Sequence, residues 1–128
     1  MYPWAGEFRT VNIARPGQFY FAFAEQILPA LGNALGQLRQ ERYLAGLDVP
    51  RFADRAAHCM GELNAIHPFR DGNGRTQREF IRQLAVRNGH ALAWSRVTRE
   101  QMYEASHRSF QSADNAGLAQ VIRAAIEG

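Results

Sequence analysis

One stretch of twelve residues, 67–78, concentrates the side chains of this sequence that can do chemistry. It contains His67, a potential general base, and Asp71, its only carboxylate, followed by the turn Gly72-Asn73-Gly74. Both glycines can adopt positive φ, so consecutive backbone N–H groups can point into one concavity. A helix is expected to begin directly after the turn, and its positive dipole end favours an anion there. The stretch therefore predicts an anion site, of the kind that holds phosphate, beside a base.

Two arginines follow the turn at helical spacing. Arg75 and Arg78 are three residues apart, so both are expected on nearly one helix face, aimed back over the anion site. Planar guanidinium groups suit phosphate oxygens, and two of them match a polyphosphate better than a single phosphate. Beside bound phosphates, Asp71 is expected to hold Mg²⁺. His67, with an ordinary pKa of about 6.5, is the natural base for a hydroxyl nucleophile.

Each of these features also has an ordinary structural explanation. A lone histidine is usually structural, glycines beside an asparagine usually form only a turn, and a pair of arginines usually lies on a solvated face. No packing requirement accounts for all of them together at one helix start. Their coincidence favours a functional site.

Composition narrows the chemistry further. All 15 basic residues are arginine, so a Walker-type phosphate loop and a Schiff-base mechanism, which both need lysine, are excluded. The net charge is +3, but the arginines are spread along the chain, and no direct nucleic-acid binding is expected. The single cysteine, Cys59, excludes an internal disulfide, and its apolar neighbours suit a core residue better than a nucleophile.

The length of 128 residues, 46% of them hydrophobic, predicts one domain over 1–128. No apolar run is long enough to cross a bilayer, and the N-terminus lacks the pattern of a secretory signal. A soluble, cytoplasmic protein is expected.

The elements that must position the site are predicted to be helices, bounded by caps and breakers. Pro29 fits only the first turn of a helix, so the first helix should start just before it. Asp48 can cap a second helix, and Asn88-Gly89 should close a third. Thr98 opens a fourth with a capping-box pattern, and Asp114 can cap a fifth. Between these signals, apolar residues recur at helical spacing at Ile27, Leu31, Leu35, Leu38, Phe52, Ala56, Cys59, Leu63, Ile66, Phe80, Ile81, Leu84, Leu118, Val121, Ile122 and Ala125.

Two segments are expected to be non-helical. Residues 1–22 carry prolines and glycines between aromatic residues, which predicts loops and one short strand. Residues 41–47 are expected to form a short hairpin or extended flap. The second helix leads from residues 41–47 to the candidate site. Pro68 forces His67 to the end of that helix, from which its side chain can project into a cavity.

The stretch 67–78 resembles the signature of Fic-domain proteins, His-Pro-Phe-x-(Asp/Glu)-Gly-Asn-Gly-Arg-x-x-Arg, and every defined position is matched. The resemblance extends to residues 2–13 and to Glu62-Leu63-Asn64. It implies an all-α bundle of about five to six helices, with a β-hairpin flap beside the active site.

The activity implied by the resemblance is transfer of AMP from ATP to a hydroxyl side chain of another protein. His67 would deprotonate the target's Tyr, Thr or Ser, and Asp71 would hold Mg²⁺ on the α- and β-phosphates. The turn Gly72, Asn73 and Gly74 would form the anion hole, Arg75 would contact the β-phosphate and Arg78 the γ-phosphate. The target would pair with the flap, assigned to Arg42, Tyr43, Leu44 and Ala45, and Tyr103 is the candidate for contacting adenine.

Several alternatives remain open at this point. Other family members transfer phosphate, UMP or phosphocholine, and a catalytically silent binding module is a third class.

Many Fic proteins are inhibited by a glutamate from a Ser/Thr-x-x-x-Glu helix that pairs with the second arginine, here Arg78. No serine or threonine of this sequence has a glutamate four residues later. The glutamate is expected either on a small separate antitoxin or in sequence trimmed from a longer protein. Resemblance to toxin-like members would make bacterial type II topoisomerases the target in the bacterial cytosol, whereas secreted members act on small GTPases in a host cytosol.

Overall fold

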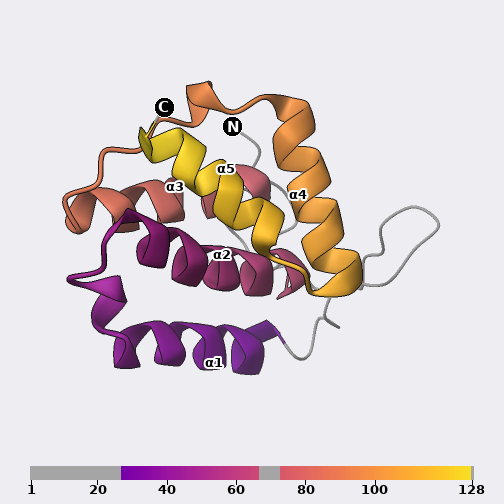
Figure 1. Ribbon diagram of the computed structural model, residues 1–128. Helices are drawn as coiled ribbons and strands as arrows, with labels where there is room; N and C mark the ends of the chain where they lie inside the picture. The colour runs from indigo at the N-terminus through magenta and orange to yellow at the C-terminus, as the bar shows by residue number, and fades with distance from the viewer. Residues whose placement is uncertain (1–26, 67–72, 128) are drawn as a thin grey trace, which may run out of the picture.

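In the computed structural model, residues 27–66 and 73–127 are described. They form five α-helices joined by short connections, two of which contain a 3-10 turn (Figure 1). The predicted all-α fold is confirmed, and no strand occurs in the described ranges. None of the described helices is both long and apolar enough to cross a bilayer. In chain order the elements are α1 (Ile27–Gln40), η2 (Arg42–Leu44), α2 (Val49–Ile66), α3 (Asn73–Arg87), η3 (Trp94–Arg96), α4 (Arg99–Ser112) and α5 (Ala116–Glu127).

Helix α2 is the centre of the bundle. It packs against α1 on one side and against α3, α4 and α5 on the others (Figure 1). Small residues let these neighbours approach closely: a side chain on Gly61 would collide with Ser109 and Asn115, which join α4 to α5. The inward positions predicted for this helix, Phe52 among them, are all buried.

The predicted starts of α2 and α4 are confirmed by hydrogen bonds, and the predicted end of α3 by its backbone conformation. The Asp48 carboxylate accepts from the backbone N–H of Arg51 at 3.1 Å, at the start of α2. Thr98 forms a complete capping box with Gln101 at the start of α4. Gly89 follows the end of α3 with a φ of +80°, a conformation that favours glycine. These local signals suffice to start and stop the helices.

The inward face of α1 differs from the prediction. Ala34 is buried between Ile27 and Leu38, whereas Leu35 is 45% exposed. Among the described elements, α1 packs only on α2 and η2, so it buries a narrower stripe than a fully enclosed helix. Counting every leucine at helical spacing as core was therefore wrong at Leu35.

The flap predicted over residues 41–47 is also wrong. Arg42, Tyr43 and Leu44 all have positive φ and make one tight 3-10 turn, in which the Ala45 N–H donates to the Arg42 carbonyl oxygen. Leu44 is fully buried, and the Tyr43 carbonyl oxygen accepts from Asn88 Nδ2 at 2.9 Å. These contacts occupy backbone groups that a target strand would need for pairing.

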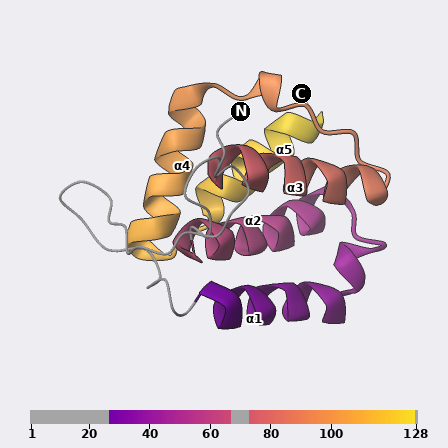
Figure 2. The ribbon, with the colours of Figure 1, turned by 180° about the vertical axis from the view of Figure 1, so that it is seen from behind.

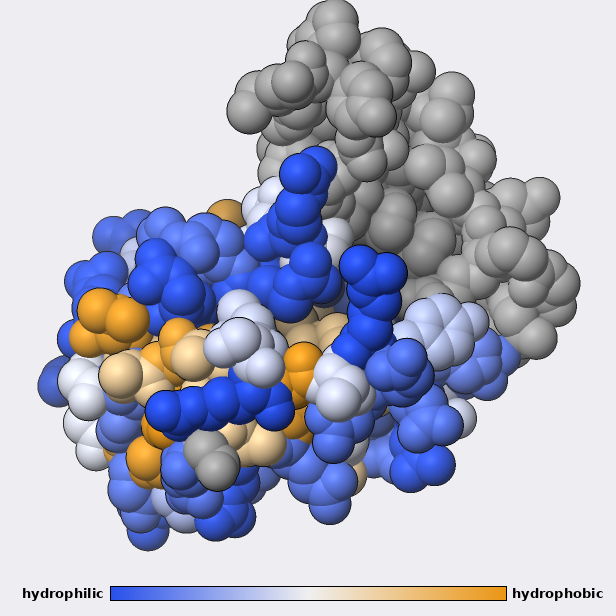
Figure 3. Space-filling model, turned by 90° about the horizontal axis from the view of Figure 1, so that it is seen from above, coloured by the Kyte–Doolittle hydropathy of each residue, from blue (hydrophilic) through white to orange (hydrophobic). Residues whose placement is uncertain are grey.

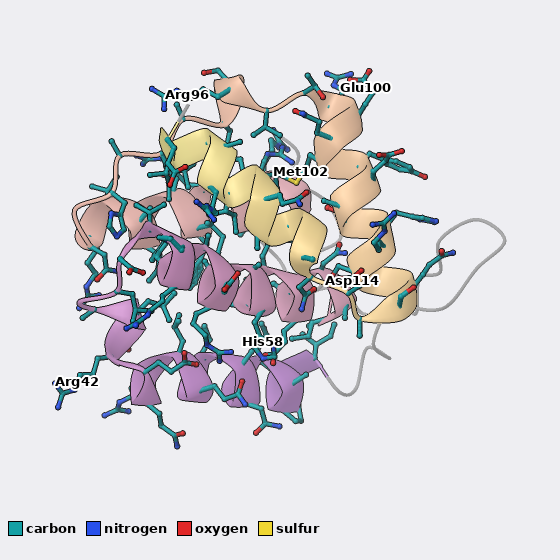
Figure 4. All side chains as sticks on the ribbon, in the orientation of Figure 1. Arg42, His58, Arg96, Glu100, Met102 and Asp114 are labelled. Carbon is teal, nitrogen blue, oxygen red and sulfur yellow. The ribbon has the colours of Figure 1, made fainter. Side chains whose placement is uncertain are left out.

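The position of η2 is equally incompatible with a flap. It precedes the first turn of α2, whereas the stretch 67–78 begins directly after the last turn. An 18-residue helix is about 27 Å long, so the two lie at opposite ends of α2. Figure 4 shows the side chain of Arg42 pointing away from the bundle at that far end.

The connection from α3 to α4 is fastened to the end of α5. The Ala93 N–H donates to the Ala125 carbonyl oxygen at 3.0 Å, and Arg96 Nη1 donates to the Ile126 carbonyl oxygen at 3.0 Å. Both acceptors belong to the last turn of α5, whose carbonyl groups have no partner within their own helix. Seen from the side of η3, hydrophobic residues form a band bordered by hydrophilic side chains (Figure 3).

Cys59 is a core residue, as predicted. It is 6% exposed on the buried face of α2, and burial raises the pKa of its thiol from 9.0 to about 11. A thiol in this environment stays protonated at neutral pH, so it is a poor nucleophile.

This shift predicts a pH dependence of stability. The unfolded chain ionises Cys59 near pH 9 and the folded chain near pH 11, so the stabilisation present below pH 9 is lost as pH rises through about 11. The loss attributable to this thiol amounts to about 3 kcal/mol at most. Denaturant titrations at several pH values should show a steeper fall in the free energy of unfolding for the wild type than for Cys59→Ala. Equal slopes would contradict the assignment.

Candidate active site

The site predicted from the sequence lies at the start of α3. His67, Asp71 and Gly72 fall outside the described residues, and so does the side chain of Asn73. Helix α3 begins at Asn73, so Gly74, Arg75 and Arg78 occupy its first two turns. From behind (Figure 2), α3 starts on the side of α4 and runs toward the end that carries η2. The predicted helix start is thus present and includes Asn73 and Gly74, whereas the residues before it lie outside the described part of the chain.

Arg78 folds back over the first turn of α3. A Cβ atom placed on Gly74 would lie 3.1 Å from Arg78 Nη1, so the guanidinium group rests against the bare backbone of the glycine. This brings a fixed positive charge to the helix N-terminus, where free N–H groups and the dipole already favour an anion. Arg75 is exposed and does not line the pocket described next. The two arginines are therefore not equivalent.

A pocket of about 500 Å³ opens beside Gly74 and Arg78. Helices α2, α3 and α4 contribute walls, together with the connection that carries η3. Figure 4 shows Met102 pointing from α4 into the interior, toward α3. The described lining residues are Met60, Asn64, Gly74, Gln77, Arg78, Trp94, Val97, Thr98, Arg99, Met102, Tyr103 and Ser106.

The described lining of the pocket is positively charged. It includes two arginines, Arg78 and Arg99, and no acidic residue among those described. The other walls are largely apolar or aromatic. An elongated ligand with an anionic end and a flat or apolar end fits such a surface.

Tyr103 belongs to this pocket, as expected for a residue near the ligand. Its side chain is 62% exposed, and its ring stacks on His107 with centroids 5.8 Å apart and planes 10° from parallel. The ring is thus held at a fixed orientation on α4. The structure brings Gly74, Arg78 and Tyr103 together, and leaves Arg42 to Ala45 at the far end of α2.

Two polar links that the sequence analysis did not assign hold the pocket walls together. Asn64 is buried, and its Nδ2 donates to the Ser106 carbonyl oxygen at 3.0 Å, which ties α2 to α4. Trp94 Nε1 donates to the Arg78 carbonyl oxygen at 2.8 Å, which ties the η3 connection to α3. The link from Asn64 could have been predicted, because a polar side chain lies there between the apolar Leu63 and Ile66. Trp94 offered a weaker signal, because a half-buried indole N–H generally needs an acceptor.

The carboxylates with displaced pKa values lie outside the pocket lining. A bidentate hydrogen bond from Arg55 lowers the pKa of Glu41, and hydrogen bonds from Arg82 and Gln83 lower the pKa of Glu79 to about 2. Both are partly or fully exposed ion pairs, one between Glu79 and Arg82 on α3 and one between Glu41, which precedes η2, and Arg55 on α2. They stabilise helix surfaces and leave the pocket positive.

Comparison with known proteins agrees with the resemblance read from the sequence. The sequence profile described as "Fic/DOC family" matches residues 1–85. The chain is 47% identical over 110 residues to protein adenylyltransferase VbhT of Bartonella schoenbuchensis, covering 86% of this chain and 23% of that protein. It is 39% identical over 107 residues to the probable protein adenylyltransferase Fic of Escherichia coli, covering 83% of this chain and 52% of that protein. The chain therefore spans about half or less of the length of these two relatives.

Solved structures show the same fold. The N-terminal Fic domain of a putative cell filamentation protein from Bartonella quintana, with bound ADP, superposes with a TM-score of 0.92 at 29% identity. That match covers 97% of this chain and 64% of that one. The BepC protein of Bartonella tribocorum, with bound AMPPNP, gives a TM-score of 0.88 at 28% identity over 97% of this chain and 66% of that one. The motif, the helical bundle and these matches together show that the chain belongs to the Fic/DOC family.

Proposed function

We propose that this chain is the catalytic part of a protein adenylyltransferase, which moves AMP from ATP to a Tyr, Thr or Ser hydroxyl of a target protein. The observation that carries the proposal is Arg78, folded over Gly74 at the N-terminus of α3 in a pocket whose described lining has no acidic residue. This arrangement suits the phosphates of a nucleotide. The names of the relatives and the nucleotides bound in the Bartonella structures support the same chemistry.

The reaction needs a base, an anion site and a leaving group. His67 accepts the proton of the target hydroxyl, whose oxygen bonds to the α-phosphorus of ATP as the bond to the β-phosphate oxygen breaks and pyrophosphate departs. Backbone N–H groups of 72–74 and the dipole of α3 bind the phosphates, with Arg75 on the β-phosphate and Arg78 on the γ-phosphate. Positioning and charge stabilisation supply most of the catalysis in such transfers.

Asp71 is the residue proposed to hold Mg²⁺. The described residues contain no cluster of three or more His, Cys, Asp or Glu side chains that could bind a metal. Mg²⁺ is often held by one carboxylate together with phosphate oxygens and water, so a single aspartate two residues before the start of α3 in the sequence fits it. When bound, the ion neutralises charge on the phosphates.

The pocket beside Arg78 also bears on regulation. A carboxylate presented by another protein segment could pair with the Arg78 guanidinium and exclude the γ-phosphate, and the pocket has the volume to receive such a segment. A small antitoxin supplying a glutamate is the proposed partner. For a toxin-like protein of this kind the target is a bacterial type II topoisomerase, and for a secreted effector it is a host small GTPase.

The central test is labelling of a target protein by ATP. Alkyne-tagged ATP should label a protein in lysate, and His67→Ala should abolish the labelling, because the base is lost while the helical circular dichroism persists. Mass spectrometry of the labelled protein identifies the target and the transferred group.

Two outcomes of that experiment would contradict the proposal. Labelling that survives His67→Ala would reject the mechanism, and an added mass other than that of AMP would reassign the donor. If salt-sensitive DNA binding appeared instead, unaffected by motif substitutions, the chain would be a binding module.

Gly74→Ala separates stability from function. Alanine favours the helix over glycine by up to about 1 kcal/mol, so the melting temperature should stay equal or rise. The added methyl would lie 3.1 Å from Arg78 Nη1, so the guanidinium group would have to shift by a few tenths of an ångström at the anion site. Calorimetric titration should show ATP affinity lowered roughly 3- to 10-fold, the loss expected for one weakened charged hydrogen bond. Gly36→Ala, on α1 with no atom near its added Cβ, is the matched control and should leave ATP affinity unchanged.

Tyr103 is proposed to stack on the adenine base. Stacking of a base on an aromatic side chain contributes about 1–3 kcal/mol, so Tyr103→Ala should weaken ATP binding roughly 5- to 100-fold. Tyr103→Phe keeps the ring and should bind ATP as the wild type does. If Tyr103→Ala retains wild-type ATP affinity, adenine lies elsewhere.

A further inference from the structure

The hydrogen bond from Trp94 to the backbone of Arg78 joins two parts of the molecule that meet at the anion site. Trp94 Nε1 lies 2.8 Å from the Arg78 carbonyl oxygen, and both residues line the same pocket. We infer that Trp94 is a positioning residue for Arg78, and that it thereby sets how strongly the site prefers a nucleoside triphosphate to a monophosphate. The inference rests on the proposed function, which assigns the terminal phosphate to Arg78.

Among the described elements, helix α3 makes extensive contact only with α2. Contacts along one side oppose rotation about the helix axis less than contacts on two sides would, so an additional hydrogen bond to another element limits that rotation further. A side-chain group about 5 Å from the axis moves on the order of 1 Å for a 10° rotation. A displacement of that size at a catalytic site can cost about 10²-fold in rate.

The indole can serve as an anchor because the connection that carries it is hydrogen-bonded on both sides, by a backbone N–H group before Trp94 and by the side chain of Arg96 after it. Ala93, the residue before Trp94, donates to the Ala125 carbonyl oxygen, and Arg96, two residues after Trp94, donates to the Ile126 carbonyl oxygen. Thr98 then caps α4. Figure 4 shows Arg96 at the side of the molecule where α5 ends. The connection is therefore attached to α4 and α5, and these attachments limit how far the indole can move.

The other end of the link reaches the ligand site directly. The Trp94 bond fixes the main chain of Arg78, and the side chain of Arg78 returns to rest against Gly74. The guanidinium group thus rests against Gly74 at the helix N-terminus, and the main chain that carries it is held by the Trp94 hydrogen bond. A change in α3 rotation would move this group relative to the phosphates and leave the Tyr103 ring, on α4, in place.

A purely structural role for Trp94 predicts something different. A half-buried indole N–H needs an acceptor, and losing it would lower the stability of the fold without regard to the ligand. Phosphate discrimination separates the two roles, because only a positioning role alters the terminal phosphate selectively.

The experiment measures ATP and AMP affinities by calorimetry on the intact chain. Trp94→Phe removes the donor and keeps an aromatic ring, and we expect ATP affinity to fall about 3- to 10-fold while AMP affinity stays within 2-fold of wild type. Asn88→Ala is the matched control, because Asn88 Nδ2 bonds to the Leu84 and Tyr43 carbonyl oxygens at the other end of α3, away from Arg78. It should lower the melting temperature and leave the ratio of ATP to AMP affinity unchanged.

A double-mutant cycle links the effect to Arg78. In an Arg78→Ala background, Trp94→Phe should cause no further loss of ATP affinity. If Trp94→Phe fails to fold, benzothienylalanine at position 94 supplies the same shape without the N–H group. Equal losses of ATP and AMP affinity, no loss at all, or a full loss that persists in the Arg78→Ala background would each overturn the inference. If the wild type itself does not prefer ATP to AMP, or if Arg78→Ala keeps that preference, the proposed assignment of the γ-phosphate to Arg78 is wrong instead.

Discussion

Helix α2 is covered by four other helices along much of its length, and its small residues determine how closely they approach. Gly61 marks the tightest point, where any side chain would meet the Ser109–Asn115 hydrogen bond. A helix enclosed in this way can offer a ligand only its ends. The stretch 67–78 follows one end, so the candidate site lies where α2 stops and α3 and α4 can both contribute side chains.

The sequence was sufficient for the helices because their signals are local. Asp48 and Thr98 accept the N–H groups of residues three positions on, and both caps occur as predicted. It failed at Leu35, whose exposure depends on how few neighbours α1 has, and at residues 42–44. There a left-handed turn of non-glycine residues is held by the burial of Leu44 and a hydrogen bond from Asn88, 45 residues away from Tyr43. Nothing within the segment itself encodes those contacts.

The candidate site divides in the same way. The residues of its anion-binding half are consecutive in the sequence, at 67–78. Their side-chain chemistry was therefore enough to predict roles for His67, Asp71 and Arg78. Its other half is assembled by packing, from Asn64 on α2, Trp94 in η3 and Met102 on α4. Tyr103 lines the pocket, but no spacing argument distinguished it from other exposed aromatic residues, and its contact with adenine stays a prediction. Tertiary contacts decide which side chains become walls.

Arg78 is where these halves depend on each other. Its charge belongs to the motif, but its position depends on the absence of a side chain at Gly74 and on a hydrogen bond from Trp94. Trp94 in turn is held by the last turn of α5, which lies far from the motif in sequence. Because a guanidinium group gains its specificity from orientation more than from charge, these two contacts bear directly on which groups Arg78 can bind.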